Sequence, residues 1–283
     1  MTAQNESATD AAKRTSPRLG VKCGFVAVPV STSEKNWTVA GELRIPESDE
    51  GAARTRMPAI VIVHGSSGVD SRGLFYARAL NAAGFVTLEI DLWAARGVKS
   101  PEERPRSVVE TLPDAFAALS YLAGRADIDP ARIGIMGFSW GGVVSMLSAT
   151  RKYGDSFASS DIRFAAHAPL YPVCWIYNTV PGYEFGELTG APVFVQAGAD
   201  DKYDGPDSAQ ALARSGANDG DDPVRVVVYD GATHAWDRCE PDMIANDPTA
   251  HQGKGGPVPF VFNPAVAERS RQAIVAFFQK ILG

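Results

Sequence analysis

The segment Gly137-Phe138-Ser139-Trp140-Gly141 constrains this chain more than any other. It follows a short apolar run, Ala131 to Met136, and precedes small and apolar residues from Gly142 to Thr150 that suit a buried helix. A strand, a sharp turn and a helix around G-x-S-x-G form a nucleophile elbow, which holds a serine hydroxyl above the end of a sheet. The glycines allow the helix to pack where a Cβ would collide. The sequence therefore predicts Ser139 as a nucleophile, although the pattern alone also occurs in ordinary glycine-rich turns.

A histidine late in the chain is the expected base for this serine. A serine hydroxyl needs a base, the base needs an orienting acid, and in this type of fold the acid comes first and the histidine second. Of the four histidines, His234 follows Val224 to Tyr229, a β-branched run typical of a late strand. We therefore predict His234 as the general base, the alternative being a histidine in a surface loop.

The orienting acid is expected after the preceding strand, Ala191 to Ala197. Three carboxylates follow closely: Asp200, Asp201 and Asp204. The spacing from Gly198 favours Asp201, with Asp200 as the main rival. Such an acid holds the imidazole in one tautomer and stabilises its cation. The other two aspartates are expected in a solvated turn or at a helix cap.

An oxyanion-binding loop is expected after Pro58 to Val63, an apolar run typical of a central parallel strand. This run leads into His64-Gly65-Ser66-Ser67-Gly68. Backbone amides of such a loop, together with that of Trp140 after the nucleophile, can bind a developing oxyanion. We predict Ser66 as the donor from the loop, with Ser67 as the alternative. His64 ends an early strand and is expected to hold the loop by hydrogen bonds.

Together these segments resemble the dienelactone hydrolase branch of the α/β-hydrolase family over nearly all of residues 20–283. The motifs are the elbow and four further segments: Asp91-Leu92-Trp93-Ala94-Ala95-Arg96, Tyr171-Pro172-Val173-Cys174, Gly198-Ala199-Asp200-Asp201 and Gly231-Ala232-Thr233-His234-Ala235-Trp236. The resemblance implies a hydrolase of carboxylic esters or lactones that forms an acyl-enzyme intermediate. Such a mechanism needs neither a metal nor an organic cofactor.

Two features of the sequence bear on the substrate. The best-known members of the family carry a cysteine nucleophile, whereas Ser139 makes this chain more similar to the carboxylesterase-type relatives. In family members an arginine four residues after the histidine helps to bind a substrate carboxylate, and Arg238 has that spacing. Two interpretations stay open: Arg238 binds a carboxylate of the substrate, or it is a solvated arginine of the loop.

Aromatic and cationic side chains are predicted to line the mouth of the site and to bind substrate. They are Trp93, Arg96, Tyr171, Trp236 and Arg238, with Trp140 and Trp175 nearby. Aromatic walls suit a small or medium acyl or aryl group, and an arginine suits a carboxylate. The alternative is that several of them pack beneath a lid.

Rival functions stay open at the level of the sequence. Acyl transfer to an alcohol, or amide hydrolysis, uses the same three residues. A non-catalytic binding protein on this fold usually lacks one of them, and here all three candidates are present.

Composition excludes several partners. The net charge is −6, and the sequence has no basic stripe that could bind nucleic acid. No run approaches the roughly 18 apolar residues that a membrane-spanning helix needs. Residues 1–18 lack the apolar stretch of a secretion signal and are expected to form a disordered tail. The cysteines, Cys23, Cys174 and Cys239, lack metal-like spacing. We therefore expect a reduced cytoplasmic protein that binds a small-molecule substrate as a monomer or homodimer.

Strands and helices alternate along the rest of the chain. This predicts one catalytic domain, residues 19–283, with the α/β-hydrolase fold: an open, mostly parallel sheet with helices on both faces and the site beyond the carboxyl ends of its strands. Residues 97–106 are expected to be a mobile excursion, 171–190 a small lid and 239–262 a long loop. Asn263 is expected to cap a last helix whose apolar stripe packs in the core.

Overall fold

The computed structural model describes residues 20–47, 56–158, 162–215 and 224–283, so the predicted tail lies outside the described residues. The strands of the main sheet are β1 (Val21–Ser31), β2 (Asn36–Pro46), β3 (Met57–Val63), β4 (Val86–Asp91), β5 (Ile128–Phe138), β6 (Ala166–Leu170), β7 (Val193–Gly198) and β8 (Val224–Tyr229). Their order is β1-β2-β4-β3-β5-β6-β7-β8. From β4 to β8 neighbouring strands are parallel, whereas β2 runs antiparallel to β1 and β4.

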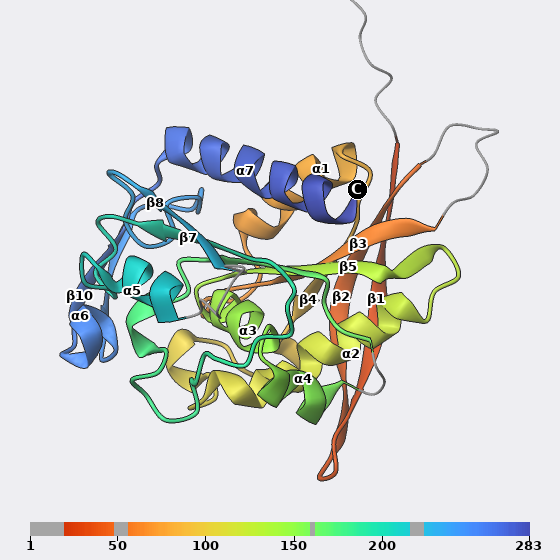
Figure 1. Cartoon of the computed structure of the whole chain (residues 1–283), viewed down its shortest axis with the longest axis horizontal. Helices are drawn as coiled ribbons and strands as arrows, with labels where there is room; N and C mark the ends of the chain where they lie inside the picture. Colours follow the sequence, from red (N-terminus) through yellow and green to blue (C-terminus); the bar gives the residue numbers. More distant parts are fainter. Residues whose placement is uncertain (1–19, 48–55, 159–161, 216–223) are drawn as a thin grey trace, which may run out of the picture.

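Helices cover both faces of this sheet. They are α1 (Ser71–Ala82), α2 (Leu112–Ala123), α3 (Trp140–Ser148), α4 (Arg151–Phe157), α5 (Ser208–Ser215), α6 (Ala250–Gly253) and α7 (Pro264–Leu282). In Figure 1, α1 and α7 lie above the sheet and α2, α3, α4 and α5 lie below it. The α/β-hydrolase fold predicted from the sequence is confirmed.

The central strand β3 is buried on both faces, as its continuous apolar run predicts. Ile60 and Ile62 pack with Phe278 of α7 in one core cluster, and Val61 and Val63 belong to the cluster on the opposite face. Successive side chains of a strand point to opposite faces, so a strand covered on both sides must be apolar throughout. This strand therefore delivers the residues that follow it to a fixed point at the edge of the sheet.

The last helix also begins and packs as predicted. The side chain of Asn263 accepts a hydrogen bond from the backbone of Val266 across 3.1 Å, which satisfies one of the free amides at the start of α7. Ile274 and Phe278 are fully buried on the inner face of the helix. The apolar stripe of α7, to which these two residues belong, therefore packs in the core.

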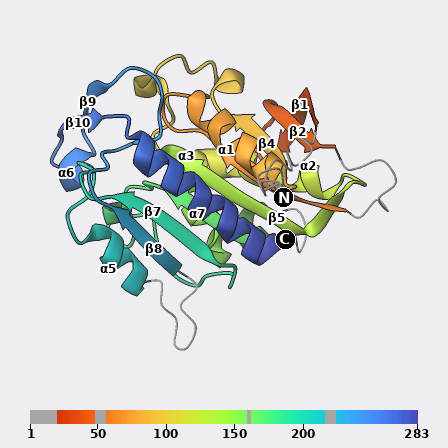
Figure 2. The ribbon, with the colours of Figure 1, turned by 90° about the horizontal axis from the view of Figure 1, so that it is seen from above.

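The prediction of a single long loop over residues 239–262 is wrong. The structure has a two-stranded antiparallel sheet, β9 (Met243–Asp247) with β10 (Gly256–Phe260), joined by α6. Pro257 and Pro259 hide the strand pattern in the sequence, but proline is tolerated on an edge strand and both strands here are edges. Figures 1 and 2 place this hairpin at the end of the molecule that holds α5, opposite β1 and β2.

Candidate active site

Ser139 stands in a strained turn between β5 and α3. Its φ of 50° and ψ of −108° are unusual for a residue with a side chain. Two backbone hydrogen bonds hold the turn: Ser139 N donates to Leu170 O across 3.0 Å, and Gly141 N donates to His64 O across 3.1 Å. The ends of β3 and β6 therefore fix the position of the serine, which is half-buried.

The glycines around the serine allow this close packing, as predicted. A Cβ on Gly137 would lie 2.2 Å from the carbonyl oxygen of Gly141, and one on Gly141 would lie 2.1 Å from that of Val63. A Cβ on Gly142 would lie 2.7 Å from the carbonyl oxygen of Leu170. Each of these contacts is with backbone, which cannot move aside like a flexible side chain.

The structure brings Ser139, His234 and Asp201 together in one chain of contacts. His234 Nε2 lies 2.8 Å from Ser139 Oγ, and His234 Nδ1 lies 2.7 Å from Asp201 Oδ2. His234 and Asp201 are 1% and 5% exposed. A hydrogen-bonded serine, imidazole and buried carboxylate are the groups that serine-dependent acyl transfer requires.

The other two aspartates lie elsewhere. Asp200 is exposed. Asp204 accepts hydrogen bonds from the backbone of Cys174 and Trp175, at 2.9 and 2.8 Å, and so joins this loop to the segment after β6. Burial and the charge of Asp201 raise the pKa of Asp204 to about 7.

Three aromatic rings surround the imidazole of His234. The ring centroids of Tyr171, Tyr203 and Phe260 lie 4.9, 4.5 and 5.3 Å from that of His234. Tyr171 directly follows β6, Tyr203 lies in the loop after β7, and Phe260 ends β10. The imidazole is thereby enclosed on the sides that do not face Ser139 or Asp201.

The predicted oxyanion loop turns sharply between Gly65 and Gly68, where Gly68 N donates to Gly65 O across 3.0 Å. Trp93 Nε1 donates to the carbonyl oxygen of Ser66 across 3.0 Å and holds the loop from outside. Within the part of the chain that the structure describes, the amides of Ser66 and Trp140 donate to no other group. Both are therefore free to donate to a ligand.

His64 lies beneath this loop. The backbone amide of Leu92 donates to His64 Nε2 across 2.9 Å, so Nδ1 carries the proton, and it lies 2.7 Å from Gly65 O. Both ring nitrogens are used within the fold, which agrees with the expected structural role. His167 is fully buried, and burial lowers its pKa to about 4.

The aromatic residues predicted to bind substrate are largely hidden from solvent. Trp93 is 5% exposed, and Tyr171 and Trp236 are both 0% exposed. Trp236 packs against Tyr171, with ring centroids 4.7 Å apart, and therefore lies behind the ring that contacts His234. In this conformation these side chains support the site from within, which is the alternative that the sequence left open.

The two arginines predicted to bind substrate have partners within the protein. Arg96 Nη2 lies 2.7 Å from Asp114 Oδ2, and Asp114 is fully buried. Arg238 Nη1 donates to the carbonyl oxygen of Pro241 across 3.1 Å, and its Nε lies 3.7 Å from Glu240. Both guanidinium groups are thus tied to neighbouring residues, although Arg238 Nε itself is buried and donates a hydrogen bond to no group among the described residues.

Sequence reasoning missed residues from two segments that meet beside the site. Arg104, in the segment predicted as an excursion, has its guanidinium 5.5 Å from the ring of Trp140. Tyr203 donates through its hydroxyl to Asp247 Oδ2 across 3.0 Å while its ring faces His234. The position of Tyr203 two residues after Asp201 is a signal that could have been used; Arg104 and Asp247 carry none.

Among the described residues, no group of three or more His, Cys, Asp and Glu side chains is arranged to hold a metal ion. No helix in the same part of the chain is long and apolar enough to span a membrane. Cys174 is buried, and Cys23 and Cys239 are exposed and free.

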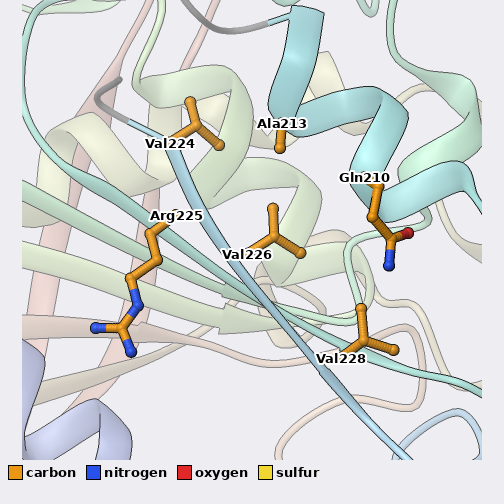
Figure 3. Close-up of a pocket in the computed structure, with 6 residues that line it drawn as sticks. All are labelled: Gln210, Ala213, Val224, Arg225, Val226 and Val228. Carbon is orange, nitrogen blue, oxygen red and sulfur yellow. The ribbon is translucent and has the colours of Figure 1, made fainter. Parts of the chain in front are cut away.

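A hollow of about 500 Å³ lies between α5 and the edge strand β8. Figure 3 shows Gln210 and Ala213 of α5 beside valines of β8, with Arg225 turned away from them. Arg225 stacks on Phe194, 4.8 Å from its ring. None of the candidate catalytic residues lines this hollow.

The fold and the site define a member of the α/β-hydrolase superfamily. Comparison with protein-family models matches residues 47–282 to the dienelactone hydrolase family. The chain belongs to this family.

Individual relatives are distant. An uncharacterized protein of Mycobacterium tuberculosis is 30% identical over 184 residues, 62% of this chain and 63% of that protein. A candidate carboxymethylenebutenolidase of Methylorubrum extorquens is 30% identical over 135 residues, 41% of this chain and 46% of that protein. The chain thus spans less than two thirds of the length of these curated relatives.

A solved structure has the same fold. It is the dienelactone hydrolase-like promiscuous phosphotriesterase P91, from metagenomic libraries, with a TM-score of 0.59, 18% identity and coverage of 92% of this chain and 99% of that one.

Proposed function

We propose that this protein hydrolyses carboxylic esters or lactones of small molecules through an acyl-enzyme on Ser139. The observation that carries the proposal is the chain of contacts from Ser139 through His234 to Asp201, at 2.8 and 2.7 Å. Family membership and the Methylorubrum relative support the same class of substrate.

In the first half of the reaction, His234 Nε2 removes the proton of Ser139 as Oγ attacks the carbonyl carbon. Asp201 stabilises the imidazolium that forms and keeps Nδ1 protonated. The oxyanion accepts hydrogen bonds from the amides of Trp140 and Ser66, which have no other acceptor among the described residues. Donors of this kind contribute roughly 3–4 kcal/mol each to the transition state. The imidazolium then protonates the leaving alcohol.

In the second half, water attacks the acyl-enzyme with His234 again as base. Ser139 is released with its proton, and the acid product leaves. Each step uses only these residues, the two backbone amides and water.

The test is a rapid-mixing assay with p-nitrophenyl acetate, together with labelling by a fluorophosphonate. We expect a burst of p-nitrophenol equal to the enzyme concentration when deacylation is the slower step, and a label on Ser139. Ser139→Ala should fold normally, lose about 10⁴-fold or more in kcat and take no label. Ser156→Ala, an exposed serine of α4, is the matched control and should behave as the wild type. An unlabelled wild type, or a Ser139→Ala variant with a tenth of its activity, would overturn the proposal.

A further inference from the structure

A layer of buried polar side chains lies directly behind His234. Tyr171 donates through its hydroxyl to Asp237 Oδ1 across 2.6 Å, and Tyr76 donates to Asp237 Oδ2 across 2.8 Å. Arg72 Nη1 donates to the Tyr171 hydroxyl across 3.2 Å. Arg72 is 3% exposed, and the other three side chains are 0% exposed. Burying a carboxylate is costly without such partners, so both of its oxygens are held by donors.

The layer is anchored at both ends. Arg72 pairs with Asp70 through Nε and Nη2, at 2.8 and 2.6 Å, and a Cβ on Gly65 would lie 3.0 Å from Arg72 Nη2. Arg72 therefore lies against the oxyanion loop. At the other end Tyr76 contacts Ser270 of α7, with 2.7 Å between the hydroxyl oxygens. The layer therefore ties α1, the segment after β6, the histidine loop and α7 together.

Within this layer, Tyr171 alone of the two tyrosines contacts His234. The rings of Tyr171 and His234 meet edge to face, with centroids 4.9 Å apart and an interplanar angle of 66°. Tyr171 has a φ of 37°, and its amide donates to Gln196 O across 2.7 Å. The preceding carbonyl, of Leu170, accepts the amide of Ser139. The wall behind the imidazole is thus built into the same backbone that holds the nucleophile.

From this arrangement we propose that Asp237 is a positioning residue, which acts through the Tyr171 hydroxyl to hold the ring that aligns His234 with Ser139. The inference rests on the proposed function. The imidazole can rotate about its bond to Cβ, and a rotation moves Nε2 away from Oγ. A ring fixed at its hydroxyl as well as at its backbone prevents this rotation. The contribution therefore belongs to the chemical step, not to substrate binding.

Tyr171→Phe and Tyr76→Phe form a matched pair for the test. Each removes one buried hydroxyl that donates to the same carboxylate, but only the first belongs to the ring against His234. We expect both variants to lose similar stability. Tyr171→Phe should lower kcat on p-nitrophenyl acetate by about 10- to 100-fold, the range for a misplaced catalytic group, with KM within about twofold. Tyr76→Phe should keep kcat within about twofold.

A second readout separates this inference from the proposed function. In the proton NMR spectrum, the downfield resonance of the His234 Nδ1 proton reports its hydrogen bond with Asp201 whether or not an ester is cleaved. We expect it to broaden or shift in Tyr171→Phe and to persist in Tyr76→Phe. Equal kcat and equal spectra for the two variants would overturn the inference, while an inactive and unlabelled wild type would overturn the proposed function. Should Tyr171→Phe fail to fold, Asp237→Asn takes its place, and wild-type kcat in that variant contradicts the inference.

Discussion

Arg104 Nη2 lies 3.2 Å from Asp247 Oδ2, so the segment between β4 and α2 meets the β9–β10 hairpin through an ion pair. The same carboxylate oxygen accepts the Tyr203 hydroxyl. Arg104 also stacks near Trp140, the residue after the nucleophile. A partly exposed cation therefore lies closer to the nucleophile elbow than the sequence indicated.

This relationship changes which arginine is expected to select an anionic substrate. Because Arg238 is held by Pro241 and Glu240, Arg238→Ala should lower kcat/KM by the same factor on a neutral ester and on its carboxylate-bearing analogue. Arg104 also has an internal partner, Asp247, but only through Nη2, and its guanidinium lies 5.5 Å from the ring of Trp140, the residue after the nucleophile. Arg104→Ala should therefore lower kcat/KM selectively on the anionic ester, by about 1.5–3 kcal/mol for a charged hydrogen bond. The measurement is kcat/KM for both esters with both variants. Selective loss in Arg238→Ala alone would restore the role that the sequence suggested.

Arg96 is expected to matter for stability instead of specificity. Its partner Asp114 is fully buried and also accepts a hydrogen bond from Trp37 Nε1 across 2.7 Å. Burial raises the pKa of Asp114, and the charge of Arg96 opposes that shift. Removing one partner of a buried pair leaves an uncompensated charge, so Arg96→Ala should cost about 3 kcal/mol or more in urea denaturation.

The control for Arg96 is an exposed ion pair. Lys152 and Glu184 lie 2.7 Å apart with about half of each side chain exposed. Lys152→Ala should cost less than about 1 kcal/mol. If Arg96→Ala is equally mild, and shifts the preference between the two esters, Arg96 binds substrate.

The parts of the site that could be predicted are those that short motifs carry. Ser139 and Asp201 follow the buried strands β5 and β7, His234 follows the edge strand β8, and parallel strands deliver such residues to one edge of the sheet. Short motifs do not show which side chains line the substrate pocket. Trp93 and Tyr171 look suitable for a substrate in sequence, but their burial depends on contacts with residues far along the chain.

Long-range contacts also explain what was missed. Asp237 lies three residues after His234, yet its partner Tyr76, and Arg72, which donates to Tyr171, belong to α1, more than 150 positions earlier. No local pattern links them. The β9–β10 hairpin was missed for a local reason, because its prolines and glycines are the residues that usually mark a loop.

The orienting acid can be separated from its neighbours by a series of conservative changes. Asp201→Asn keeps the shape of the side chain but favours the wrong tautomer of His234, which should cost on the order of 10⁴-fold in kcat. Asp200→Asn and Asp204→Asn should cost far less, because neither carboxylate contacts the imidazole. Steady-state kinetics on one ester decides between them. A larger loss at Asp200 would reverse the assignment, and equal losses at Asp200 and Asp201 would contradict it.

Asp204 should make the stability of the protein depend on pH. Burial and the charge of Asp201 raise its pKa to about 7, well above that of an unfolded aspartate. The folded state therefore binds this proton more tightly than the unfolded state does. The stabilisation is fully present below the unfolded pKa, about 4, and is lost as the pH rises through about 7.

An asparagine at position 204 cannot lose a proton, and it keeps one acceptor for the amides of Cys174 and Trp175. Between pH 5 and pH 8, the free energy of unfolding of the wild type should therefore fall relative to that of Asp204→Asn by more than about 1 kcal/mol, since one pKa unit corresponds to 1.36 kcal/mol. Urea denaturation of both proteins at the two pH values measures this difference. Asp200→Asn, which changes an exposed carboxylate in the same loop, should follow the wild type at both pH values. Parallel behaviour of the wild type and Asp204→Asn would show that the Asp204 carboxylate is already charged at pH 5.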